Sequence, residues 1–261
     1  MRRLFPVPSE PTGDTEREWE LAELADAYAY PGTAAGAGAA GTPWLRANMV
    51  SSMDGAAHHG GRSRPLSNAA DMRIFGVLRG LADVVIVGAE TVREERYRPA
   101  RRRAEFAERR AAAGQTTVPA IAVVSASLHL DFSLPLFTEP DVPTLVITGA
   151  KAPHSGLVAA REAGAEVVTA GDEAGVDPRR IKPELARRGY TRLLTEGGPR
   201  LLGQLAAAGV VDEVCLTISP RFTVGTAPRV MSGPEIEAPV DMELTDLLAE
   251  SGFLFGRYRL A

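Results

Sequence analysis

The chain has 261 residues, of which 45% are hydrophobic and 24% are charged, with a formal net charge of −4 and one cysteine. This composition is typical of a soluble globular protein and predicts one large α/β domain rather than two small ones. It excludes an overall basic surface for nucleic acid, a membrane span of ~20 apolar residues, a disulfide framework and a thiolate metal cluster.

The N-terminal 43 residues are expected to stand apart from a main domain that runs over residues 44–261. Residues 1–13 are rich in proline and predict an extended arm. Residues 14–28 begin with acidic side chains and carry apolar residues at helical spacing, which favours a short amphipathic helix. The Gly/Ala-rich residues 31–42 are typical of a flexible linker. No apolar stretch here has the length of a signal peptide, so we expect a cytoplasmic protein.

From Trp44 onward, short apolar runs alternate with helically spaced segments. This alternation predicts a three-layer α/β/α fold, with a mixed, mostly parallel sheet, helices on both faces and the last strand antiparallel at the sheet edge. Strands are expected at residues 44–52, 83–88, 118–125, 142–148, 165–169, 190–194, 210–219 and 252–260, and helices at 68–79, 152–164, 177–188 and 199–208. Cys215 falls in one of these strands and is expected to be buried.

Residues 91–115 contain a dense run of arginines interleaved with Glu and Ala. Such a run is usually a solvated helix face or surface loop. We prefer that interpretation to a phosphate-binding or RNA-binding patch.

Three of the expected strands end in polar or glycine-rich segments, at residues 51–55, 87–91 and 195–198. In an open α/β sheet, ligands bind outside the carboxyl ends of the strands, so these segments are expected to meet at one crevice. The fingerprints GxGxxG, the Walker lysine loop, GxSxG and HExxH are absent. His58 and His59 have no acidic or thiol partner at metal-ligand spacing, so no metal site is expected.

The stretch TRLLTEGGPRLLG at residues 191–203 has the strongest features of a ligand site. A strand is followed by Gly197 and Gly198, and Pro199 opens a helix whose first N–H groups are unpaired donors, so a pyrophosphate can bind there. Glu196 places a carboxylate beside this turn. The alternative is a strand-to-helix connection whose glycines serve packing alone.

The succession SSMDG, GGRS, a helix ending in VLRG, DVVIVGAETV, VVS, TEGGPRLLGQL and VDEVCLTISP closely resembles the reductase domain of riboflavin biosynthesis, the dihydrofolate-reductase-like half of the bifunctional deaminase–reductase. Seven motifs occur in the family's order over residues 44–260. The resemblance implies a homodimeric NADPH-dependent reductase with a dihydrofolate-reductase-like sheet. Such an enzyme reduces 5-amino-6-(5-phosphoribosylamino)uracil to the ribitylamino product.

The motifs also carry over the family's functional residues. Asn48, Ser63 and Arg79 are implied on the substrate side, and Glu196 and Asp54 are the candidate catalytic acids, with Glu196 preferred because it adjoins the pyrophosphate turn. The implied cofactor-binding residues are Gly88, Thr91, Glu95, Ser125 near the adenosine 2′-phosphate, Gly197, Gly198, Pro199, Arg200, Leu201, Leu202, Gly203 and Gln204.

Each role has a structural alternative. Asp54 precedes a glycine, so its role could be limited to forming a turn, and the role of Ser63 could be limited to capping a loop. Arg79 could complement the dipole of its own helix, and Thr91 could be the N-cap of a helix that begins at Val92.

The chain also departs from the family's pattern. The deaminase half binds zinc through one His and two Cys, so a chain with one cysteine is expected to lack that activity. Asn48 stands where the bifunctional enzymes often have Lys, Pro65 where they have Trp, and Glu95 where Asp is usual. These differences bear on the substrate more than on the cofactor. They leave two further hypotheses, a dihydrofolate or pterin reductase and a non-catalytic NADPH-binding protein.

Overall fold

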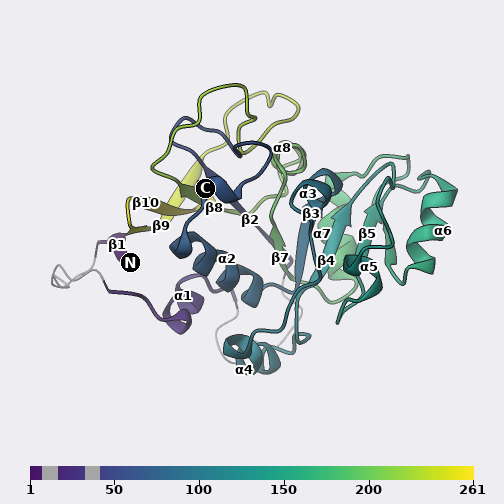
Figure 1. The fold of residues 1–261 in the computed structure, drawn as a ribbon, viewed down its shortest axis with the longest axis horizontal. Coiled ribbons are helices and arrows are strands. Elements are labelled where there is room, and N and C mark those ends of the chain that lie inside the picture. The colour runs from purple at the N-terminus through teal and green to yellow at the C-terminus, as the bar shows by residue number, and fades with distance from the viewer. Residues whose placement is uncertain (8–16, 33–41) are drawn as a thin grey trace.

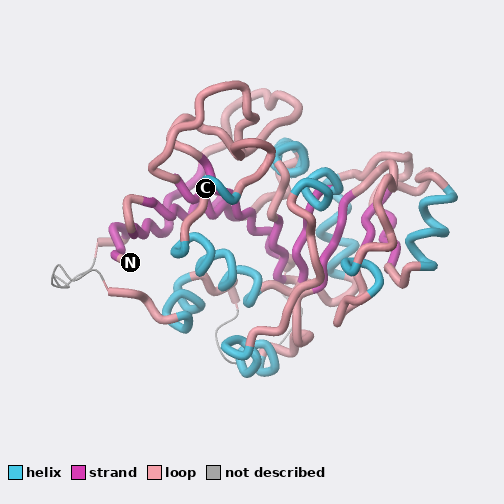
Figure 2. The backbone as a smooth tube through the Cα atoms, in the orientation of Figure 1, coloured by secondary structure: helices cyan, strands magenta, loops and turns pink. Residues whose placement is uncertain are grey.

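A computed structural model describes residues 1–7, 17–32 and 42–261, which form one sheet covered by helices (Figures 1 and 2). The strand order is β1-β9-β10-β8-β2-β7-β3-β4-β5-β6. The strands are β1 (Arg2–Phe5), β2 (Trp44–Ser51), β3 (Val84–Gly88), β4 (Ala120–Val124), β5 (Leu145–Thr148), β6 (Glu166–Thr169), β7 (Arg192–Thr195), β8 (Glu213–Ile218), β9 (Met242–Glu250) and β10 (Phe253–Leu260).

Helices cover both faces of this sheet, and the predicted three-layer α/β/α fold is confirmed. The first face packs against α1, α2, α4, α5 and α6, and the second against α7 and α8. The α-helices are α1 (Leu21–Ala27), α2 (Ala69–Leu81), α3 (Ala89–Glu94), α4 (Ala104–Ala112), α5 (Pro135–Thr138), α6 (His154–Glu162), α7 (Pro178–Ala186) and α8 (Pro199–Ala207).

The central strands are parallel and are buried on both faces. Strands β8, β2, β7, β3, β4, β5 and β6 pair in parallel, and the four residues Val84 to Val87 of β3 are each 0% exposed. A continuous apolar run suits this position because side chains on both faces of the strand enter a core. The carboxyl ends of the parallel strands therefore lie along one edge of the sheet, where the sequence predicts the site.

The antiparallel end of the sheet differs from the prediction. Strand β10 is antiparallel as expected, but it pairs with both β8 and β9, so its predicted edge position is wrong. Strand β9 was not predicted, because its side chains are mostly half-buried and its sequence lacks regular alternation. Strand β1 pairs with β9 and forms the edge, so residues 2–5 belong to the sheet and not to a separate arm.

The N-terminal helix is shorter than predicted. Helix α1 begins at Leu21, after a capping box formed by Glu20 and Glu23. Residues 8–16 and 33–41, which contain most of the expected linker, lie outside the described residues. The division of the chain at residue 43 stays a prediction.

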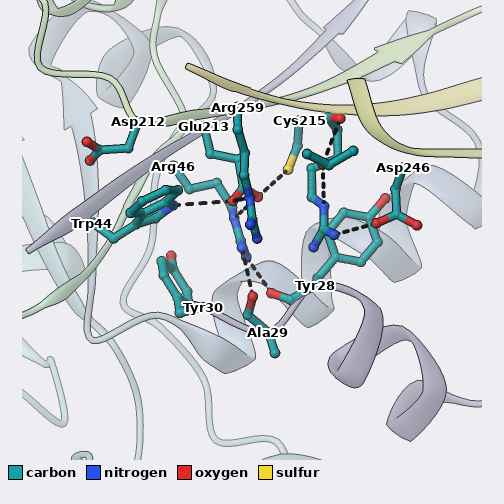
Figure 3. Close-up of polar contacts among 12 residues, drawn as sticks. Tyr28, Ala29, Tyr30, Trp44, Arg46, Asp212, Glu213, Cys215, Asp246 and Arg259 are labelled. Atoms are coloured by element: carbon teal, nitrogen blue, oxygen red, sulfur yellow. Dashed lines mark hydrogen bonds and ion pairs between the residues drawn. The ribbon is translucent and has the colours of Figure 1, made fainter. Parts of the chain in front are cut away.

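A buried charged cluster attaches the segment after α1 to the sheet (Figure 3). We define the Arg46 cluster as Arg46, Glu213, Tyr28, Ala29 and Tyr30. Arg46 Nε lies 2.7 Å from Glu213 Oε1, both side chains are 0% exposed, and Arg46 Nη1 donates to the carbonyl of Tyr28 at 2.7 Å. The guanidinium also lies 4.2 Å from the centre of the Tyr30 ring. This geometry makes the segment part of the folded core.

Cys215 lies beside the Arg46 cluster and is buried, as predicted (Figure 3). Burial is the main reason that the pKa of its thiol is raised to about 12. Arg46 and Arg257 lower this pKa and Glu213 raises it, each by a smaller amount. The thiol is therefore protonated at neutral pH and chemically inert.

In the three described ranges, no helix is long and apolar enough to cross a membrane.

Candidate active site

A cavity of about 910 Å³ opens at the carboxyl ends of β2 and β7 and continues along α2. Its walls come from β2, α2, the loop before α2, the end of α3, the connection from α3 to α4, and the turn before α8. The site is therefore assembled at the strand ends, where the sequence places it. A cavity of this size accommodates a small-molecule substrate together with part of a cofactor.

The glycine turn forms one wall of this cavity. Gly198 is the N-cap of α8, Pro199 is its first residue, and both line the cavity. Gly197 has φ of +79°, in the left-handed region that favours glycine, and its carbonyl accepts a hydrogen bond from the Gly88 N–H at 2.7 Å. A Cβ on Gly198 would lie 2.5 Å from Thr91 Oγ1, so a larger residue there would force the Thr91 side chain to move. Two of the three expected strand ends thus meet at this turn.

A helix of nine residues that starts at a glycine turn suits a pyrophosphate. The first N–H groups of α8 have no carbonyl partner within the helix, and the positive end of the helix dipole lies at the cavity. The residues present therefore fit the diphosphate of a dinucleotide.

The remaining residues of the expected cofactor stretch, Arg200 to Gln204, differ in their surroundings. The side chains of Leu201 and Leu202 are buried in the core, and a Cβ on Gly203 would lie 2.5 Å from the Ser232 carbonyl oxygen. Arg200 is 79% exposed and makes a long ion pair with Glu90, and Gln204 is exposed. The main-chain N–H groups at the start of α8 are suited to a diphosphate, and the cofactor roles implied for residues 200–204 stay predictions.

Glu196 is held by two neighbours in the cavity wall. Arg79 Nε and Nη2 donate to its two carboxylate oxygens at 2.6 and 2.7 Å, and the Tyr97 hydroxyl donates to Oε2. The Arg79 guanidinium lies 4.6 Å from the centre of the Phe75 ring and 5.4 Å from that of Tyr97. The carboxylate is thus an acceptor in a bidentate ion pair, which disfavours the predicted role of Glu196 as a proton donor.

The acid–base properties of its two partners agree with this geometry. Burial raises the pKa of the Tyr97 hydroxyl well above its usual value, and the Glu196 charge raises it further. Burial is the largest single effect on Arg79 and acts to lower its pKa, but Glu196 and Tyr97 together outweigh burial and raise that pKa above its usual value. Tyr97 therefore stays neutral and Arg79 stays charged. Tyr97 could not be recognised from the sequence, because it lies inside the arginine run, where no pattern distinguishes it.

Ser63 and Glu95 are in direct contact. The Ser63 N–H and hydroxyl each donate to Glu95 Oε1 at 2.9 Å, and both residues line the cavity. The resemblance implied that they lie on different sides of the site, one towards the substrate and one towards the cofactor. Their contact instead joins the loop before α2 to the end of α3.

The other expected residues are divided between the cavity and its surroundings. Asn48 on β2 and Thr91 within α3 line the cavity. Thr91 is not a helix N-cap, because α3 begins after Gly88. Ser125 is 6% exposed, accepts a hydrogen bond from the Leu128 N–H at 3.1 Å, and does not line the cavity.

Asp54 has a structural role. It is exposed, lies outside the cavity lining, and accepts hydrogen bonds from Ser52 Oγ at 2.5 Å and the Val224 N–H at 2.7 Å. The Ser52 hydrogen bond is the largest cause of the lowered pKa of Asp54. The prediction that Asp54 is a catalytic acid is therefore not supported. Its carboxylate instead ties the turn after β2 to the loop after β8, and Figure 1 shows the two loops together.

The arginine run borders the cavity. Most of its side chains are exposed, as expected for a charged run, but its position beside the site was not predicted. Arg102 pairs with Asp141 at 3.0 Å. The run makes the margin of the cavity electropositive. The arginines of this margin are Arg96, Arg98, Arg101, Arg102 and Arg103 from the run, together with Arg62 and Arg64 from the loop before α2.

No group of three or more His, Cys, Asp and Glu side chains is arranged as a metal site within the described parts of the chain.

Three comparisons relate this geometry to known proteins. The profile of the RibD C-terminal domain family matches residues 43–251. A 2,5-diamino-6-ribosylamino-4(3H)-pyrimidinone 5′-phosphate reductase of Aquifex aeolicus is 31% identical over 67% of this chain and 75% of its own length. The enzyme of the same name from Archaeoglobus fulgidus is 27% identical over 83% of this chain and 98% of its own length. The crystal structure of a pyrimidine reductase-like protein from Corynebacterium diphtheriae superposes with a TM-score of 0.75 at 30% identity, covering 84% of this chain and 92% of that one.

Proposed function

The chain belongs to the RibD C-terminal domain family, as its motifs predicted, and from this premise we propose that it is an NADPH-dependent reductase. Its substrate is a ribosylaminopyrimidine 5′-phosphate, and the reaction converts the ribosylamino side chain to ribitylamino. The observation that carries the proposal is one cavity that combines the glycine turn of α8, the Arg79–Glu196 ion pair and an arginine-rich margin.

The parts of the cavity match the parts of the reactants. The start of α8 is suited to the diphosphate of a dinucleotide, and the arginines of the margin are suited to a 5′-phosphate. Glu196 and Arg79 offer an acceptor and a donor to the polar groups of the substrate. The family supports a nicotinamide cofactor in general, whereas the choice of NADPH over NADH rests on the motif resemblance. The assay therefore compares NADPH with NADH.

The chemistry requires orientation and exclusion of water more than acid catalysis by the protein. A bound nicotinamide cofactor would supply a hydride to C1′ of the ring-opened imine form of the ribosylamine. The imine nitrogen takes one proton, so the substrate gains two hydrogen atoms. Because Glu196 is engaged by Arg79 and Tyr97, we expect this proton to come from solvent and not from Glu196.

The named relatives and the motifs point to two versions of the substrate. The Aquifex and Archaeoglobus enzymes are named for the 2,5-diamino compound, whereas the deaminase–reductase resemblance implies 5-amino-6-(5-phosphoribosylamino)uracil. The two compounds carry the same ribosyl phosphate, which is the part that reacts. The proposal therefore covers both, with the uracil as first expectation.

The experiment that tests the proposal follows NADPH oxidation with each pyrimidine and with dihydrofolate, and identifies the product by mass spectrometry. We expect turnover with at least one pyrimidine, a product heavier by two hydrogen atoms, and weaker binding of the dephosphorylated substrate. Turnover with dihydrofolate alone would overturn the assignment. NADPH binding without any turnover would instead support a non-catalytic protein.

We also expect a cytoplasmic homodimer, as the family resemblance implies. Both properties stay predictions.

A further inference from the structure

Tyr97 reaches Glu196 because of the way the chain leaves α3. Arg96 has φ of +53°, in the left-handed region, and the Tyr97 N–H donates to the Val92 carbonyl at 3.0 Å, across the last turn of the helix. Glu95 is fixed at the same point by Ser63. A non-glycine residue in this conformation is costly, and such residues concentrate at functional sites. The local backbone thus directs Tyr97 towards the end of β7.

The hydrogen bonds that Glu196 accepts from Arg79 and Tyr97 leave part of its acceptor capacity available to a ligand. An ionised carboxylate accepts about four hydrogen bonds. Three are made: Oε1 accepts one from Arg79, and Oε2 accepts one from Arg79 and one from Tyr97. One acceptor position is left at Oε1. Arg79 has five N–H donors, of which two are donated to Glu196, and the Tyr97 hydroxyl can take at most one more, so donor capacity remains. The wall therefore offers an acceptor beside a donor.

We propose that Tyr97 is a positioning residue, whose hydroxyl fixes Glu196 and Arg79 as a preformed acceptor–donor pair for a hydrogen-bonding group of the substrate. The inference rests on the proposed function. Tyr97 itself does not supply the proton of the reaction, because its only O–H is donated to Glu196. Without that bond, Oε2 loses one of its two donors and the carboxylate can rotate on Arg79.

The variant Tyr97→Phe removes the hydroxyl and keeps the ring beside Arg79. The dissociation constant of each pyrimidine substrate is measured by calorimetry in the presence of NADP⁺, alongside kcat and KM with NADPH. We expect the dissociation constant and KM to rise about 10-fold, the loss for one hydrogen bond to a charged group, with kcat and the affinity for NADPH close to wild type. Tyr190→Phe is the matched control, because Tyr190 is half-buried outside the cavity and has no described hydrogen bond through its hydroxyl.

A double-mutant cycle separates positioning from other roles. If Tyr97 acts through Glu196, the effect of Tyr97→Phe on substrate binding disappears in a Glu196→Gln background. An effect of equal size in that background would overturn the inference. So would a fall in kcat at unchanged KM, or a parallel loss of NADPH affinity and thermal stability.

The wild-type protein distinguishes failure of this inference from failure of the proposed function. Wild-type turnover together with an unaffected Tyr97→Phe variant would overturn the positioning role alone. A wild-type protein that neither binds nor reduces the pyrimidines would overturn the proposed function and the positioning role with it.

Discussion

The protein contains two Arg–Glu pairs that look alike in chemistry and differ in surroundings. In the Arg46 cluster, Arg46 and Glu213 are each 0% exposed, and Arg46 lies against the Tyr30 ring. In the cavity wall, Arg79 is 23% exposed and Glu196 4% exposed, and Arg79 lies against Phe75 and Tyr97. The first pair is bonded only within the protein, whereas the second keeps donor and acceptor capacity towards the cavity.

The difference shows that the role of an Arg–Glu pair depends on where its other hydrogen-bonding atoms point, towards the protein interior or towards a cavity. Arg46 directs Nη1 and Nη2 to the carbonyls of Tyr28 and Ala29, so its bonding capacity is used to attach a chain segment. Within the described residues, Arg79 donates to Glu196 and not to main-chain carbonyls, and the Arg79–Glu196 pair lines a cavity of about 910 Å³. We therefore expect mutations at the two pairs to separate stability from ligand binding.

The largest effect is expected where the buried pair is broken. Arg46→Met leaves the Glu213 carboxylate without its closest cation and should lower the free energy of unfolding by about 3–5 kcal/mol. Denaturant unfolding measures this loss. The double variant Arg46→Met/Glu213→Leu should recover part of it, because no fully buried charge remains unpaired, and Arg259, which also pairs with Glu213, is partly exposed. A loss below about 1 kcal/mol for Arg46→Met would mean that this pair stabilises the protein no more than an exposed surface pair does.

The corresponding change in the cavity should act on the reaction instead. Glu196→Gln removes the charge that Arg79 and Tyr97 hold, and we expect kcat/KM to fall about 100-fold, with a smaller loss of stability than in Arg46→Met. Steady-state kinetics and denaturant unfolding are compared on the same samples. Glu94→Gln is the control, because Glu94 also lines the cavity but is exposed. A stability loss equal to that of Arg46→Met would remove the distinction between the two pairs.

The glycine turn extends the comparison to the cofactor. Gly198→Val places side-chain atoms against Thr91, so the dissociation constant of NADPH should rise about 10-fold or more while the protein stays folded. Fluorescence titration measures the affinity and circular dichroism checks the fold. Gly175→Val is a matched control, since a Cβ there meets no atom within 4 Å. An unfolded Gly198→Val protein would indicate that the turn serves packing alone.

The smallest effect is expected at Asp54, an exposed carboxylate outside both pairs. Its pKa is lowered in the folded state, chiefly by the Ser52 hydrogen bond, so it stabilises the protein above the unfolded pKa of about 4. This contribution is lost as the pH falls through the lowered pKa. Asp54→Asn should thus be slightly less stable than wild type at neutral pH, and the gap should close in acid. Thermal unfolding over a pH series measures it, and a gap that persists unchanged in acid would contradict this account.

The features predicted correctly from sequence depend on local patterns. The apolar run at Val84 to Val87 indicated a central strand, and the glycine turn before Pro199 indicated the start of α8. Both signals lie within a few adjacent residues. The position of the site at the strand ends followed from the alternation of strands and helices.

The features that were missed depend on contacts between distant residues. Arg79 and Glu196 are 117 positions apart in the sequence, so neither could be recognised as the partner of the other. Tyr97 lies in a charged run whose composition resembles that of any solvated surface. Asp54 was expected either to be a catalytic acid or to form a turn, and the hydrogen bonds that its carboxylate accepts from the loop after β8 could not be predicted from the sequence.

The bonds of Arg46 also bear on where this fold can be cut. The family profile begins at residue 43, after the carbonyls of Tyr28 and Ala29 that Arg46 binds and the carbonyl of Ala27 that Arg257 binds. A protein trimmed to the boundary of the profile would keep both arginines in the sheet and lose their main-chain acceptors. We therefore expect a chain trimmed to the boundary of the profile to be less stable than the full chain, because these hydrogen bonds are lost.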